Sequence, residues 1–429
     1  MTLNISPDDV CWAQAETISD TWLLQFLAID ILRPIADFIL QHNRGNATEF
    51  AILRTGSYNI SLRLQYEPHG ATVIRFPQPG AVLFPEEKVI HEVSVMRFLT
   101  DQTTIPVPFI LHSGTKQESP LALSPFILME YLEHETKLYD ALNTPGLPRE
   151  QRGVLDPDIT QEKLERLYAP MADVLLQLSL PALPRIGSLS QRDDFTWEVT
   201  RRPLSMNMNE LVRLGCLPRS QLPSIDTTFP TASAYVQSLA DFTYAAPVEF
   251  CHAPPGWLLI ERPEEWAGGI EAWSRVFEAR LQTSLRVMRE CEDREIQRGR
   301  FYEGQRLSGP MEKSWESGDF WVMYALRNSF AFDLVYWLEI DERFFGDSGR
   351  GADRAWEKRV GLLSEKERRE MELLVTMKMA ERGSRPLVWD ADEYTWAFQR
   401  KLDRRRDGDG GGKDEVGGGG TGADGMDSR

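Results

Sequence analysis

Cysteine is scarce in this chain of 429 residues, and its four copies stand far apart. They are Cys11, Cys216, Cys251 and Cys291, and no two of them form a C-x-x-C pair. A disulfide framework needs many cysteines in a short chain, and a structural zinc site needs closely spaced ligands. The sequence therefore predicts neither, and we expect reduced thiols in a cytoplasmic protein.

Long apolar runs are also missing from the sequence. Residues 22–40 are the most apolar stretch, but charged residues and a proline interrupt it, which favours an amphipathic segment over a membrane span. The first residues carry Asp8 and Asp9 where a signal peptide would have a basic region followed by an apolar one. We therefore expect neither a secretory route nor a membrane partner.

Positive charge is in deficit, with 48 Lys and Arg residues against 65 Asp and Glu residues and a net charge of −17. An acidic surface repels a phosphate backbone, so we expect no nucleic-acid partner. A small basic pocket for an anion is compatible with this balance. The 42% hydrophobic content excludes a mainly disordered chain and is sufficient for a large core.

The N-terminal part of the chain has the hydrophobic periods of helices and short strands. Residues 12–43 have a near-helical apolar stripe, and Pro34 is expected to break or kink this helix. Residues 58–66 alternate between apolar and polar side chains, which predicts a strand. A turn over residues 67–70 joins it to a second strand over 71–76, so the two form a hairpin. We also expect a strand over 50–54, a helix over 85–99 that begins at a proline, and a buried strand over 126–132.

From residue 138 onward, the sequence is expected to be mostly helical. Amphipathic segments cover residues 164–178, which Pro170 interrupts, and residues 271–297. Ser364 and Glu367 match a capping box that opens a helix to about residue 382. The predicted class is α+β, with a small β-rich lobe and a larger helical lobe. We assign residues 1–45 to an N-terminal helical arm, 46–131 to the β-rich lobe, 132–400 to the helical lobe and 401–429 to a disordered Gly-rich tail.

Candidate phosphate-binding residues occur in the β-rich lobe. Gly56 and Ser57 lie at a predicted turn, where glycine lets backbone N–H groups approach a phosphate and Ser57 can donate its hydroxyl. The alternative for this turn is an ordinary hairpin connection. Arg75 lies on the next strand and Glu92 on the helix after it, and kinase-like sites use such a basic residue oriented by a helix carboxylate. A solvated arginine and a surface glutamate are the alternative.

Several motifs, taken in order, resemble those of the aminoglycoside phosphotransferase family, and most of all its large fungal branch. They are Gly56-Ser57-Tyr58-Asn59, Val73-Ile74-Arg75-Phe76, His91-Glu92-Val93, Pro106-Val107-Pro108, Ile127–Leu132, Phe242–Phe250 and Ser314–Trp321. The resemblance extends over residues 45 to 345. It implies a bilobal, protein-kinase-like fold. It also implies a parent reaction in which the γ-phosphoryl group of ATP passes to the hydroxyl of a small-molecule substrate.

The resemblance also implies roles for individual residues. Gly56, Ser57 and Asn59 fall in the nucleotide loop. Arg75 takes the place of the basic residue that binds the phosphates, and Glu92 matches the helix carboxylate that pairs with it. Glu130 lies at the hinge, where backbone groups meet the adenine.

One part of the family pattern is missing from the sequence. Members carry a catalytic loop of the form H-x-D-x-x-x-x-N and a short metal-binding D-W-E element, but no Asp in this chain is followed by Asn five residues later. Asp241 directly precedes Phe242, and we interpret this D-F-T sequence as a product of the junction, not as a metal site. We therefore expect several dozen residues to be absent at the 241/242 junction, with no catalytic residue and no metal ligand. ATP binding would then be weak at best, and Mg²⁺ would not bind.

Three interpretations of the function stay open at this point. The first is a phosphotransferase-like protein that is catalytically inactive in this form. The second is a non-catalytic, pseudokinase-type protein that acts as a binding partner or scaffold. A third possibility is that another acidic residue substitutes and that weak activity survives. The sequence indicates neither the substrate nor the oligomeric state.

Overall fold

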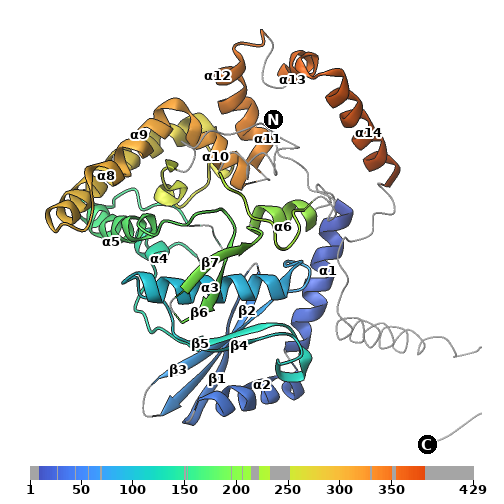
Figure 1. Cartoon of the computed structure of the whole chain (residues 1–429), viewed down its shortest axis with the longest axis vertical. Helices are drawn as coiled ribbons and strands as arrows, with labels where there is room; N and C mark the ends of the chain where they lie inside the picture. Colours follow the sequence, from blue (N-terminus) through green and yellow to red (C-terminus); the bar gives the residue numbers. More distant parts are fainter. Residues whose placement is uncertain are drawn as a thin grey trace, which may run out of the picture.

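The fold is that of a computed structural model, which describes most of the chain between residues 9 and 381. The described ranges are 9–26, 28–43, 45–56, 58–67, 70–148, 151, 153–194, 196–204, 206–213, 222–231, 252–328, 331–349 and 354–381. Within them, an antiparallel sheet lies at one end of the molecule and most helices lie at the other (Figure 1). The α+β class predicted from the sequence is confirmed. The domain boundaries stay predictions, and the tail from residue 401 lies outside the described ranges.

The sheet has five strands in the order β1-β2-β3-β5-β4, and every neighbouring pair is antiparallel. The strands are β1 (Asn46–Thr55), β2 (Asn59–Glu67), β3 (Ala71–Pro77), β4 (Ile110–Gly114) and β5 (Phe126–Glu130). Along β2 every second residue is buried, as the alternating pattern predicts. The predicted hairpin is confirmed, because Ile60 pairs with Phe76 and Gln65 with Ala71.

One face of the sheet is covered by the helices α1 (Asp9–Phe26) and α2 (Ile29–His42). Of the two effects expected of Pro34, the break is wrong and the kink stays a prediction, since the two helices separate near residue 28 and Pro34 lies inside α2. The apolar stripe of Ile31, Ile35 and Ile39 continues past the proline and is buried against the sheet. This burial outweighs the local cost of the proline, which is about 3 kcal/mol.

The opposite face of the sheet is covered by α3 (Pro85–Gln102). Val89 and Val93 of α3 pack against Ile127 of β5. The helix begins at the predicted proline, with Glu86 and Glu87 in its first turn, where carboxylates favour the helix dipole. Its last residue, Gln102, lies three positions beyond the predicted end.

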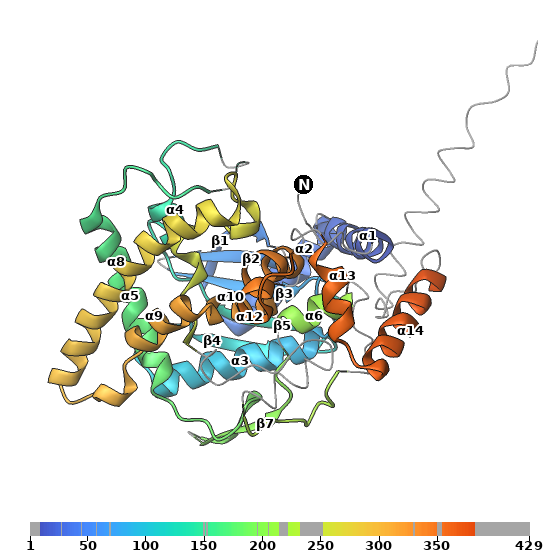
Figure 2. The same cartoon turned by 90° about the horizontal axis from the view of Figure 1, so that it is seen from above.

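A second, two-stranded sheet lies beside α3 and was not expected. It consists of β6 (Ser188–Asp193) and β7 (Thr196–Arg201), in a region that the sequence predicts to be mostly helical. Figures 1 and 2 both show this hairpin alongside α3, and Figure 2 shows it on the side of the helix away from the large sheet. Few of its side chains are buried, so it carries little of the hydrophobic alternation that identifies a strand.

The remaining described elements are mainly helical, as predicted. The α-helices are α4 (Leu138–Leu142), α5 (Gln161–Ser179), α6 (Met206–Arg213), α8 (Gly269–Gln297), α9 (Ser308–Ser317), α10 (Asp319–Arg327), α11 (Phe332–Val335), α12 (Asp341–Phe345), α13 (Ala355–Arg359) and α14 (Glu365–Glu381), with a π-helical turn η8 (Tyr336–Ile340). The 3-10 turns are η1 (Pro120–Ala122), η4 (Gly256–Leu259), η5 (Pro263–Glu265), η6 (Glu303–Gln305) and η9 (Val360–Leu362).

The core of this helical part is aromatic. Trp273 and Phe277 stack at 4.4 Å between ring centroids, and Phe320 and Trp321 of α10 pack against them. The capping box of α14 is confirmed: Ser364 N donates to Glu367 Oε2 at 2.8 Å, and Glu367 N donates to Ser364 Oγ at 3.3 Å. None of the helices in the described parts of the chain combines the length and the apolar character needed to cross a bilayer.

Candidate anion-binding site

The alternation of β3 decides where Arg75 points. Ile74 and Phe76 belong to the core shared with α1 and α2, so the side chain between them faces the opposite side of the sheet, toward α3. Arg75 pairs in register with Ser61 of β2 and with Ile127 of β5, which lies under α3. A basic side chain is thereby held between the sheet and α3, with 22% of its surface exposed.

Arg75 meets Glu92 of α3, the contact that the resemblance implies. Nη2 of Arg75 donates a hydrogen bond to Glu92 Oε1. The other carboxylate oxygen, Oε2, accepts from Lys88 Nζ at 3.1 Å, and Lys88 also donates to Asn59 Oδ1 at 3.0 Å. The four side chains form one cluster, here called the Arg75 cluster.

The Arg75 cluster carries two cations and one carboxylate. An arginine has five N–H donors and a lysine has three. The bonds to Glu92 and Asn59 use only some of these donors, so both cations can donate further hydrogen bonds. The side chains of Arg75, Lys88 and Glu92 are 22%, 19% and 30% exposed, so solvent reaches each of them. The cluster can therefore offer positive charge and hydrogen-bond donors to an anion.

Lys88 is the member of the cluster that the sequence interpretation missed. A signal for it was present, because Lys88 precedes Glu92 by four residues on a predicted helix, and such pairs share one helix face. Asn59, in contrast, was expected in the nucleotide loop, and that role stays a prediction. It joins the cluster through its side-chain oxygen.

The turn between β1 and β2 has the geometry of a hairpin connection. Gly56 N donates to Asn59 O at 2.9 Å, so this N–H group already has a partner. A Cβ at Gly56 would make only an ordinary contact, at 3.6 Å from Asn59 O. No close approach therefore requires glycine here, and its phosphate-binding role stays a prediction. Ser57 lies outside the described residues.

Glu130 does not join the Arg75 cluster. It pairs with Thr72 in the β3–β5 register, three positions along from the Arg75–Ile127 pair. Its Oε1 accepts from Phe109 N at 2.9 Å, and its own N–H donates to Phe109 O at 2.9 Å. The N–H of Tyr131 is bonded to Ala71 O at 2.8 Å. The bonds to Phe109 hold the start of the edge strand β4, and the Tyr131 bond joins the end of β5 to β3. The contact with adenine stays a prediction.

A groove of about 530 Å³ borders Glu92 on its other side, between α3 and the loops around the small hairpin. It is lined by His91, Glu92, Val95, Met96, Ser188 and Leu204, among others. Ser188 Oγ donates to Arg202 O at 2.9 Å and accepts from His91 Nδ1 at 3.1 Å. Burial lowers the pKa of His91 below its ordinary value, so its neutral form is favoured.

In the described ranges, no group of three or more His, Cys, Asp or Glu side chains is placed so that it could hold a metal ion. Asp241 and the 241/242 junction lie outside the described residues, so the expected deletion stays a prediction. Comparison with known proteins finds no matching family model, no matching curated protein and no matching solved structure.

Proposed function

We propose that this chain is a nucleotide-binding protein of the aminoglycoside phosphotransferase type, with a bilobal, kinase-like layout. Its parent reaction would be ATP-dependent phosphorylation of a small-molecule hydroxyl. In this form it would bind ATP weakly and without Mg²⁺, and it would not transfer the phosphoryl group. The observation that carries the proposal is the Arg75–Glu92 contact between the third strand of an antiparallel sheet and the helix that follows it.

The geometry supports a phosphate ligand in preference to a neutral one. Arg75 and Lys88 face one carboxylate, so the Arg75 cluster has excess positive charge within a chain whose net charge is −17. Glu92 accepts from both cations and holds their side chains in place. An anion would replace water at the remaining donors, and it would gain the stronger, charge-assisted type of hydrogen bond.

The individual residues would then have separate tasks. Arg75 and Lys88 would contact the phosphate oxygens and neutralise part of their charge. Glu92 would orient both cations. Asn59 would tie the end of the β1–β2 turn to Lys88 and so to the phosphates. All of these tasks concern binding, because the sequence lacks the D-x-x-x-x-N catalytic pattern.

Calorimetric titration with ATP tests the proposal. Arg75→Ala should weaken binding about 10- to 100-fold, since a hydrogen bond to a charged group contributes about 1.5–3 kcal/mol. Adenosine should bind no differently to the variant, because it carries no phosphate. The matched control is Arg166→Ala, which removes an arginine with 73% side-chain exposure on α5 and should leave the affinity unchanged.

Three results would contradict the proposal. If wild-type protein binds no ATP, or if Arg75→Ala and Arg166→Ala have equal effects, the Arg75 cluster is not a phosphate site. The pseudokinase-type scaffold would then be the better account. If binding is tight and requires Mg²⁺, the protein has metal ligands that the sequence interpretation overlooked.

A further inference from the structure

Helix α3 contacts three different parts of the molecule with three stripes of its surface. Val89 and Val93 pack on the large sheet. Lys88 and Glu92 form the Arg75 cluster. A third stripe faces the small hairpin and the segment that follows it, and it contains Glu87, His91, Phe98 and Asp101.

The third stripe is fixed most firmly at Glu87. Arg202, the residue directly after β7, binds its carboxylate with two parallel hydrogen bonds: Nε to Oε1 at 2.9 Å and Nη2 to Oε2 at 2.8 Å. Its third nitrogen, Nη1, donates to Pro223 O at 2.9 Å. The side chains of Arg202 and Glu87 are only 8% and 11% exposed, so this pair is shielded from solvent.

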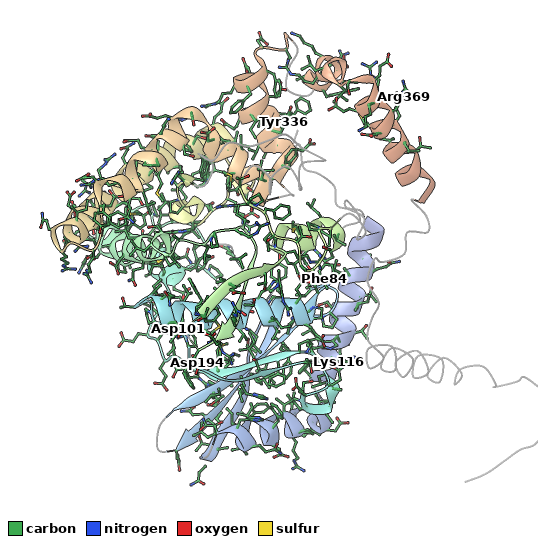
Figure 3. All side chains as sticks on the ribbon, viewed as in Figure 1. Phe84, Asp101, Lys116, Asp194, Tyr336 and Arg369 are labelled. Atoms are coloured by element: carbon green, nitrogen blue, oxygen red, sulfur yellow. The ribbon has the colours of Figure 1, made fainter. Side chains whose placement is uncertain are left out.

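Arg202 also touches the beginning of α3. Its guanidinium lies over the ring of Phe84, 4.9 Å from the ring centroid, and Phe84 is the residue before the first turn. At the other end of the helix, Asp101 accepts from Trp197 Nε1 at 3.0 Å. Figure 3 shows Phe84 and Asp101 at the two ends of α3. The hairpin and the residue directly after it thus hold α3 at both of its ends.

Between these two ends, Phe98 packs against Leu189 and Val199 of the hairpin and His91 bonds to Ser188, but the hairpin does not cover the helix along its whole length. The groove of about 530 Å³ lies there, beside Val95 and Met96. A helix with open space beside it can roll unless its contacts prevent this. Glu87 and Lys88 are neighbours in the sequence, and so are His91 and Glu92, so one roll of the helix displaces both stripes together.

We infer that Arg202 is a positioning residue for the Arg75 cluster. Arg202 holds Glu87 and so sets the rotation of α3 about its axis at which Glu92 reaches Arg75. Arg202 itself is not a member of the Arg75 cluster. This inference rests on the proposed function and deepens it. It assigns the β6–β7 hairpin the task of keeping the phosphate site in its binding geometry.

The test is a double-mutant cycle between Arg202→Met and Glu92→Gln, read as the dissociation constant for ATP. Methionine keeps an aliphatic side chain against Phe84 but cannot make the paired hydrogen bonds. Arg202→Met alone should weaken binding about tenfold, corresponding to about 1.4 kcal/mol. In the Glu92→Gln background it should have little further effect, because coupled residues are not additive. Glu87→Gln should reproduce Arg202→Met from the other side of the contact.

The control is Arg192→Ala, on the same hairpin. Arg192 pairs with Glu198 at 2.9 Å, but both side chains are well exposed, at 68% and 43%. This variant should leave the affinity for ATP unchanged. A purely structural role for Arg202 predicts a lower unfolding temperature with an unchanged dissociation constant, and that result would overturn the inference. Equal losses in the wild-type and Glu92→Gln backgrounds would overturn it as well.

A second readout separates this inference from the proposed function. If Arg75→Ala and Glu92→Gln leave ATP binding unchanged, the nucleotide site is refuted, and the same cycle is then read as the unfolding midpoint without ligand. Positioning predicts that Arg202→Met lowers the midpoint less in the Glu92→Gln background than in the wild type. Equal shifts in both backgrounds would show that Arg202 does not act through Glu92.

Discussion

Glu292 of α8 is a fully buried carboxylate at the N-terminus of α9, and its replacement should destabilise the helical part of the protein. Its Oε1 accepts from Leu307 N at 2.7 Å and from Ser308 N at 2.9 Å. Its Oε2 accepts from Ser308 Oγ at 2.6 Å and from Arg306 Nη1 at 3.3 Å. The side chain therefore satisfies two backbone donors that the start of a helix leaves without partners, and its charge favours the helix dipole.

The size of the effect follows from these bonds. In Glu292→Gln the amide oxygen can keep the two backbone bonds, but each changes from charge-assisted to neutral, a loss of about 1 kcal/mol per bond. The amide nitrogen faces Arg306, which cannot accept a hydrogen bond. We therefore expect a loss of about 2 kcal/mol for Glu292→Gln. Glu292→Ala leaves both backbone donors buried without partners, and it should cost about 4 kcal/mol.

Asp293→Ala is the matched control, because Asp293 also binds Arg306, at 2.6 Å, but is 55% exposed. Exposed pairs of this kind contribute about 0–1 kcal/mol. Urea unfolding is followed by tryptophan fluorescence, since Trp273, Trp315 and Trp321 pack together in the core beside α8. If Glu292→Gln and Asp293→Ala shift the midpoint equally, burial of the carboxylate does not stabilise this helix junction.

Two further predictions concern pH and catalysis. His112 of β4 stacks on His42 at 4.6 Å between ring centroids. Its pKa is lowered, mainly by burial and to a smaller extent by the charge of His42. The folded protein thus favours neutral His112, whereas the unfolded chain takes up the proton at about pH 6.5. The free energy of unfolding should therefore decrease as the pH falls below about 6.5. The decline in melting temperature should be smaller for His112→Phe, and an equal decline in both proteins would exclude His112 as its source. For catalysis, we expect no ATP-dependent phosphorylation of aminoglycosides or choline above background. Turnover that Asp241→Ala abolishes would show that the D-F-T sequence is a working metal site.

The parts of the fold that could be predicted are those in which the local pattern and the tertiary packing agree. In β2 the apolar residues occupy every second position, and the same positions are buried against α1 and α2. In α8, Trp273, Phe277 and Leu281 recur at helical spacing and form the aromatic core. Pro34 and the β6–β7 hairpin were misjudged because distant packing decides them. The isoleucine stripe overrides the proline, and α3 supports a hairpin whose strands bury little besides Leu189 and Val199.

The same distinction applies to the candidate site. The pairing of Arg75 with Glu92 was expected only through the resemblance, and the structure gives the physical reason: strand alternation points Arg75 toward α3, where Glu92 lies. Arg202 could not be expected, since its partner Glu87 lies 115 residues earlier and no local period connects them. Lys88 shows why a pairwise prediction was also too simple at the site itself. Arg75 with Glu92 alone would be a neutral pair, whereas Lys88 gives the cluster its positive excess. The preference of this site for a negatively charged ligand therefore depends on Lys88, the residue that the sequence interpretation left out.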